Sequence, residues 1–228
     1  MEEQVGPSRE EQVYELLVVL FLIVPSVVLS LFAFGPSQVG FVLLALATIF
    51  RDLALVALIL FFLWRNGEPL ARIGWTGHQI ATNVILGLIL SPIVILGIGL
   101  LNSLLRAAGL SGPSPAAASL VPHGPGEIAL AVILVIVVAV SEETIFRGYM
   151  IARLAATSRS MAFAVVVSSG IFAIGHGYEG TAGLTAVGVM GLVFALLLVW
   201  RRSLVAPVVI HFANDFLAIV VAPLLGLM

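Results

Sequence analysis

The sequence predicts an all-α protein, a polytopic bundle of seven or eight transmembrane segments that encloses an intramembrane cavity. Three observations predict this class. Of the 228 residues, 61% are hydrophobic and only 10% are charged, whereas a soluble domain carries about 25% charged residues. Apolar runs near the ~20 residues that a membrane span requires recur along the chain. A few charged and imidazole side chains fall inside these runs, and such side chains usually face a cavity.

The N-terminal part, residues 1–125, is expected to hold three spans and their loops. These spans are Leu16–Phe34, Gly40–Trp64 and Ile80–Leu105. Gly35-Pro36-Ser37 ends the first span, and only Arg51-Asp52 interrupts the second. The polar segment Arg65–Gln79 is expected at the membrane interface. A loop rich in Pro, Gly and Ser, Arg106–Gly126, reads as an exposed connection.

Residues 126–228 are expected to complete a single integral membrane domain. One long apolar helix begins at Ile128 and continues through a polar stretch to about Thr157. The next runs are Met161–Gly175, Leu184–Trp200 and Leu204–Met228. Pro207 and Pro223 are expected to bend or split the last run, because proline interrupts a helix. The count is therefore seven or eight segments.

The charges orient the bundle and exclude some partners. All ten cationic side chains are arginine, and no run of five basic residues occurs, so no nucleic-acid partner is expected. The chain has no cysteine, which excludes a thiol nucleophile and a cysteine zinc site. With a cytoplasmic N-terminus, that side receives Arg9, Arg65, Arg72, Arg153, Arg159, Arg201 and Arg202, and the other side only Arg106. This bias predicts a multi-pass cell-membrane protein with its N-terminus in the cytoplasm.

Two groups of polar residues lie at membrane depth, where a charge costs roughly 2.5–3.5 kcal/mol. The first is Arg51 with Asp52. Neighbouring helix positions do not face each other, so each residue is expected to have another partner, and Arg147 is one possibility for Asp52. Structural use is favoured over catalysis. The second group comprises Glu142, Glu143, Arg147, His176, His211, Asn214 and Asp215.

Spacing suggests how the second group divides. Glu143 and Arg147 are separated by four positions, with the carboxylate first, which favours an ion pair on one helix face. Glu142 points about 100° away and stays free to titrate. Glu142 and His176 lie symmetrically about Arg159 in the predicted turn, which places both about 25 Å from it along antiparallel helices. We expect them to meet in the cytoplasmic half of the bilayer, in a site that opens toward the cytoplasm.

Three motifs in this region resemble a known family. Glu-Glu-x-x-x-Arg at 142–147, Phe-x-x-x-His at 172–176 and His-x-x-x-Asp at 211–215 occur in this order on separate apolar helices. Together they resemble the CPBP family of CAAX proteases and bacteriocin-processing enzymes, also called Abi, which includes the Ras-converting prenyl endopeptidase. The resemblance covers about Ile128 to Met228, and the first three spans match only as a generic bundle.

The resemblance implies a glutamate-dependent intramembrane endopeptidase that acts on a membrane-associated or lipidated, CAAX-like peptide. It implies that Glu142 is the general base that activates water, assisted by His176. His211 and the residue four positions later would stabilise the oxyanion. That residue is Asp215, and an ionised carboxylate does not donate a hydrogen bond. Asn214 is the alternative donor, with Asp215 then orienting His211.

The residue types leave other chemistry open. Glu142, His176 and His211 could also ligate zinc with water in the fourth position, although the expectation is a metal-free site without a cofactor. A non-catalytic membrane protein, such as an immunity factor that binds a peptide in the same cavity, is the main alternative function. A proton-coupled transporter is less favoured, because the two halves show no inverted repeat.

Overall fold

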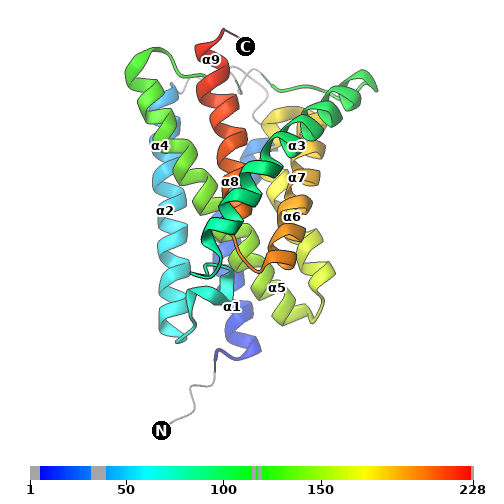
Figure 1. The fold of residues 1–228 in the computed structure, drawn as a ribbon. Helices are drawn as coiled ribbons and strands as arrows, with labels where there is room; N and C mark the ends of the chain where they lie inside the picture. Colours follow the sequence, from blue (N-terminus) through cyan, green and yellow to red (C-terminus); the bar gives the residue numbers. More distant parts are fainter. Residues whose placement is uncertain (1–5, 32–39, 115–116, 118–119, 227–228) are drawn as a thin grey trace.

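The computed structural model describes residues 6–31, 40–114, 117 and 120–226, and within these ranges every regular element is helical (Figure 1). In chain order the elements of the N-terminal part are α1 (Arg9–Leu31), α2 (Phe41–Arg65), the 3-10 turn η1 (Leu70–Ile73) and α3 (Ile80–Ala107). The prediction of an all-α protein is confirmed for these residues. The predicted end of the first span at Phe34 and its breaker Gly35-Pro36-Ser37 lie outside them.

The C-terminal part begins with one long helix whose middle changes type. Its three sections are α4 (Gly124–Glu142), the π-helix η3 (Glu143–Met150) and α5 (Ile151–Ser158). The remaining elements are α6 (Met161–Gly175), the 3-10 turn η4 (Gly177–Glu179), α7 (Gly180–Arg201), α8 (Val205–Asp215), the π-helix η5 (Phe216–Val221) and α9 (Ala222–Leu224). Ser160 caps α6 by accepting a hydrogen bond from the Phe163 amide at 3.2 Å, which supports the predicted turn before Met161.

Six helical segments of the described chain are long and apolar enough to cross a membrane, as a multi-pass membrane protein requires. They are Arg9–Val28, Phe41–Arg65, Ile80–Ala107, Gly124–Ser158, Gly177–Arg201 and Val205–Leu224. Met161–Gly175 is apolar but shorter. Val205–Leu224 is one of the spanning segments, so the expectation that Pro207 or Pro223 splits the last run is wrong. Pro207 lies in the first turn of α8, where it leaves no helical hydrogen bond unmade.

The section around η3 forms the centre of the bundle. Every residue from Ser141 to Met150 is buried, including two glutamates and an arginine. Two hydroxyl groups bond backbone carbonyls here: Ser168 donates to Phe146 O at 2.7 Å, and Thr144 donates to Val140 O at 2.6 Å. Such side-chain bonds satisfy polar backbone groups in the widened, buried helix.

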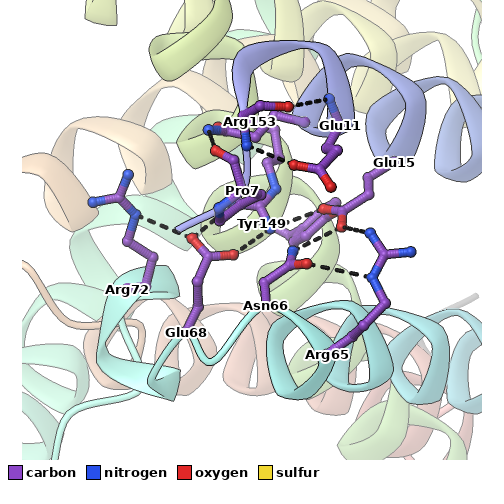
Figure 2. Close-up of polar contacts among 11 residues, drawn as sticks. Pro7, Glu11, Glu15, Arg65, Asn66, Glu68, Arg72, Tyr149 and Arg153 are labelled. Carbon is purple, nitrogen blue, oxygen red and sulfur yellow. Dashed lines mark hydrogen bonds and ion pairs between the residues drawn. The ribbon is translucent and has the colours of Figure 1, made fainter. Parts of the chain in front are cut away.

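A polar cluster that the sequence reasoning missed joins the ends of several helices near the N-terminus (Figure 2). Its centre is Glu15, whose side chain is 3% exposed. One carboxylate oxygen accepts hydrogen bonds from Arg65 and Asn66, at 2.8 and 2.7 Å. The other accepts from Tyr149 and Arg153, both at 2.9 Å. Glu15 therefore joins α1 to the end of α2, to η3 and to α5.

The same cluster continues through Arg153 to the loop after α2 (Figure 2). Arg153 pairs with Glu68, which also contacts Arg72 at 3.6 Å. Burial raises the pKa of Glu68, but hydrogen bonding and the charge of Arg153 outweigh it, so the pKa lies below its usual value. Arg9 donates to Thr157 O at 2.7 Å at the end of α5. These contacts hold the start of α1, the end of α2 and the end of α5 at one level.

Candidate active site

A pocket of about 1070 Å³ lies between the helices and is apolar over most of its wall. Its ionisable and amide side chains include most of the predicted site residues. They are Arg51, Asp52, Asn102, Glu142, His176, Tyr178, Glu179, His211, Asn214 and Asp215. The pocket therefore gathers residues from α2, from the end of α4, from the turn after α6 and from α8.

Glu142 and Glu143 have different surroundings although they are adjacent. Glu142 ends α4, lines the pocket and is 9% exposed, and its Oε2 has no hydrogen-bond partner among the described residues. Glu143 begins η3 and is completely buried. Successive helix positions point in different directions, so one carboxylate reaches the pocket while its neighbour faces the protein interior.

Glu143 bridges a cation and a histidine. Its Oε1 lies 3.2 Å from an Arg147 nitrogen, so the predicted ion pair is present. The same oxygen lies 2.9 Å from His211 Nδ1, a contact that the sequence reasoning did not include. The Arg147 guanidinium also lies over two aromatic rings, 3.9 Å from the centroid of Phe172 and 5.4 Å from that of Phe194. Cation–π contact of this kind stabilises a buried guanidinium.

The Glu143 contact fixes how His211 faces the pocket. A carboxylate only accepts hydrogen bonds, so His211 donates through Nδ1–H. Its Nε2 then lies on the pocket side, 3.8 Å from Glu142 Oε2 and 3.4 Å from Asp215 Oδ2. The carboxylate that holds the ring through Nδ1 is thus Glu143, and Asp215 lies beside the opposite nitrogen. Asn214 donates to Asp215 Oδ1 at 3.1 Å and also lines the pocket.

His176 lies on the same pocket but apart from this cluster. Its Nδ1 donates to the carbonyl of Phe172 at 2.9 Å, one turn earlier, which leaves Nε2 available. The ring lies against Phe172 and Tyr178, with centroids 4.6 and 5.9 Å away. Within the described part of the chain, no hydrogen bond or ion pair joins His176 to Glu142 or His211. His211 is therefore the histidine that lies next to Glu142, and His176 reaches the same pocket from the end of α6.

Arg51 and Asp52 enter the pocket as a pair. Arg51 Nε and Nη2 both lie 2.8 Å from Asp52 Oδ1. The expectation that each of the two has another partner is wrong, since the long Arg51 side chain folds back onto Asp52. Arg147, named as one possible partner of Asp52, pairs with Glu143. Adjacent helix positions diverge at Cβ, but an arginine is long enough to close that gap. The sequence reasoning also gave no role to Tyr178, although it lies two residues after His176.

The pocket lies in the half of the bundle away from the N-terminus. It is lined by the late part of α1, the early part of α2, the late part of α3 and the early part of α7. Arg9, Arg65 and Arg153 lie at the opposite end, joined by the Glu15 cluster. With the N-terminus in the cytoplasm, the pocket would therefore lie in the half of the membrane away from the cytoplasm.

No set of three His, Asp or Glu side chains in the described residues is arranged to hold a metal ion. Of the three residues considered for zinc, Glu142 and His211 lie close together, and His176 is bonded to the backbone of its own helix. The expectation of a metal-free site without a cofactor stays a prediction.

The C-terminal part of the chain resembles a known family. Residues 124–217 match the family model described as Type II CAAX prenyl endopeptidase Rce1-like. The match runs from α4 to the start of η5 and includes Glu142, His176, His211, Asn214 and Asp215. The resemblance to the CPBP family is confirmed. No curated protein and no solved structure matches the chain.

Proposed function

Because residues 124–217 are Rce1-like and the chain has several membrane-spanning helices, we propose that it is a CAAX-type intramembrane endopeptidase that cleaves a membrane-associated or lipidated peptide. One observation carries this proposal. A pocket-facing carboxylate of Glu142, whose Oε2 makes no hydrogen bond to the described residues, lies 3.8 Å from a histidine that a second, buried carboxylate orients. This is the arrangement expected of a general base and a charge-stabilising partner.

The proposed reaction begins with water between Glu142 and the peptide. Glu142 takes a proton from the water, whose oxygen attacks the scissile carbonyl carbon and forms a tetrahedral oxyanion. Collapse of this intermediate breaks the C–N bond, and the leaving amine receives the proton from Glu142. In this proposal His176 holds the attacking water through Nε2, since its Nδ1 is taken by the Phe172 carbonyl. A general base contributes roughly 10²–10⁴-fold to such a reaction.

His211 is the proposed oxyanion-stabilising group. Donation from Nε2 requires a protonated ring, because Nδ1 already carries a proton for Glu143. Glu143 beside one nitrogen and Asp215 beside the other favour that positive ring electrostatically. Asp215 would thus act through His211 rather than donate to the oxyanion. Asn214 has a second amide hydrogen beyond the one it gives to Asp215, and this hydrogen is the second proposed donor.

The apolar wall of the pocket suits the proposed substrate. Apolar residues of α2, α4 and η5 line it, among them Leu44, Val138 and Ile219. Such a wall would take up apolar side chains or a lipid chain and keep bulk water from the carboxylate. Arginine bias favours a cytoplasmic N-terminus, so we place the pocket in the half of the membrane away from the cytoplasm. Its substrates would then be presented from that side.

The test is cleavage of fluorescently labelled peptides, with and without a lipid chain, by purified protein in lipid nanodiscs. Glu142→Gln and His176→Ala are compared with the parent, and Glu10→Gln, an exposed change on α1, serves as the control. Glu142→Gln is expected to lower the cleavage rate about 10²–10⁴-fold, while the control leaves it unchanged. Cleavage that survives both pocket substitutions contradicts the proposal. A parent that binds these peptides without cleaving them would instead be a peptide-binding protein.

A further inference from the structure

Arg51 brings a guanidinium to the pocket. It is the one arginine among the described residues that line the pocket, and 41% of its side chain is exposed. We propose that Arg51 binds the C-terminal carboxylate of a peptide and thereby sets which peptide bond faces Glu142. This inference rests on the proposed function, because it concerns the substrate of the same pocket.

The hydrogen-bonding edges of the guanidinium support this role. A guanidinium presents five N–H groups in a rigid fork and can bind carboxylates along two edges. The Nε and Nη2 edge of Arg51 is taken by Asp52, with both nitrogens 2.8 Å from Oδ1. Nη1 has no acceptor among the described residues. The remaining edge, formed by Nη1 and Nη2, fits the two oxygens of an incoming carboxylate.

Asp52 prepares Arg51 for this contact. Asp52 is 1% exposed, so its carboxylate is fixed in the protein and holds the guanidinium at the pocket wall. Its other oxygen, Oδ2, is buried without a hydrogen-bond partner. A buried carboxylate with an unused oxygen is costly, and the arginine is the group that compensates for it. A cation held in place before binding loses less conformational entropy when its ligand arrives.

The negative charges of the pocket would repel a peptide carboxylate at every position away from Arg51. The lining contains four carboxylates in the described chain, those of Asp52, Glu142, Glu179 and Asp215. The charge of Arg51 also acts on Glu142 and on Tyr178 across the pocket. A peptide terminus would therefore be attracted at one position and disfavoured at the others, which selects a register as well as a ligand. The C-terminal carboxylate is the anion that every peptide carries, whatever its side chains.

The experiment compares one peptide with a free C-terminal carboxylate against the same peptide as a carboxamide. The parent is expected to show a kcat/KM at least ten-fold higher for the acid, mainly through KM. In Arg51→Gln the ratio of acid to amide should fall to about one, and Arg51→Lys should keep part of the preference, because lysine keeps the charge without the fork. Arg106→Gln, an exposed change outside the pocket lining, should keep the parental ratio.

A second measurement follows the register. When residues are added at the C-terminus of the substrate, the bond that the parent cleaves should move toward the new C-terminus by the same number of residues. In Arg51→Gln the position of the cleaved bond should no longer depend on the added residues. Equal cleavage of acid and amide by the parent, or an acid preference that persists in Arg51→Gln, would overturn the inference. A fixed cleavage site in the extended parental substrates would do the same.

A binding assay separates this inference from the proposed function. Labelled acid and amide peptides are titrated against Glu142→Gln, with and without Arg51→Gln, and binding is followed by fluorescence anisotropy. If the parent cleaves nothing, yet binds the acid more tightly in an Arg51-dependent way, the inference stands and the peptidase assignment fails. If cleavage depends on Glu142 but neither binding nor cleavage distinguishes acid from amide, the inference alone fails. Should Arg51→Gln not fold, the parental acid-to-amide ratio still decides.

Discussion

At the scale of single residues, the main feature is the unequal use of two adjacent glutamates. Glu142 lines the pocket with one unpaired oxygen, and Glu143 lies in the interior between Arg147 and His211. Their different surroundings suit different tasks, since only a pocket-facing carboxylate can reach water. Glu143 is a positioning residue in the proposed mechanism, because it orients His211 without facing the substrate.

Replacing Glu143 with Gln should destabilise the protein strongly. Arg147 is 1% exposed and would lose its buried counter-charge, and removing one partner of a buried pair costs about 3–5 kcal/mol. The measurement is the free energy of unfolding in detergent micelles, with Glu10→Gln as an exposed control expected within about 0.5 kcal/mol of the parent. Cleavage should fall as well, because the His211 ring loses its anchor.

The double variant Glu143→Gln/Arg147→Met tests whether the unpaired charge of Arg147 causes this loss of stability. It removes the unpaired charge, so it should recover a large part of the lost stability while cleavage stays low. If the free energy of unfolding of Glu143→Gln lies within about 1 kcal/mol of the parent's, the ion pair does not stabilise the core.

At the scale of elements, the continuous helix from α4 through η3 to α5 organises the site. Its first section brings Glu142 to the pocket, and its π-helical section is buried against η1 and α6. Gly148 permits the contact with η1, because a Cβ there would lie 2.7 Å from the Ile73 carbonyl oxygen and 3.2 Å from Leu204 Cδ1. The close approach thus depends on the missing side chain.

Gly148→Ala is therefore expected to lower stability by about 1–3 kcal/mol, the usual cost of overpacking. Gly170→Ala is the matched control on α6, since a Cβ there meets nothing within 4 Å. The control should be neutral or gain up to about 1 kcal/mol from better helix propensity. Thermal unfolding of the two variants side by side is the measurement. Equal melting temperatures of Gly148→Ala and Gly170→Ala would show that η1 moves away from η3 without loss of stability.

At the scale of the whole molecule, the two ends of the bundle differ. The end near Arg9 carries the cluster centred on Glu15, which holds α1, α2, η3 and α5 together (Figure 2). The pocket lies toward the other end, beyond which the chain returns from α3 to α4 (Figure 1). From the arginine bias we propose that the first end is cytoplasmic, and the pocket would then face away from the cytoplasm.

The absence of cysteine from the sequence makes this orientation directly testable. His78→Cys and Ala108→Cys place single exposed thiols just before and just after α3. A membrane-impermeant maleimide applied to intact cells should label the thiol at position 108 and reach the one at position 78 only after lysis. The reverse pattern would turn the pocket toward the cytoplasm and contradict the proposed orientation, while leaving the chemistry of the pocket untouched.

The sequence by itself determined the helical class, the presence of several membrane-spanning helices and the residues of the three motifs, whereas its count of seven or eight segments is not confirmed: six of the described helical segments are long and apolar enough to span. These features are local: a span follows from a run of apolar residues, and the Glu143–Arg147 pair follows from a four-residue spacing. The resemblance drawn from the motifs agrees with the match over residues 124–217. Even the short helix Met161–Gly175 has the predicted bounds.

Only the tertiary structure decided which side chains meet across helices. The contact of Glu143 with His211 and the cluster around Glu15 join residues far apart in the chain. The pairing of Arg51 with Asp52 depends on a rotamer and on the lack of another partner nearby. Such contacts are set by how each helix is rotated and how deep it lies against its neighbours, and neither quantity is encoded in the spacing along one helix. For the same reason, only the tertiary structure shows that the pocket lies in the half of the bundle away from the N-terminus.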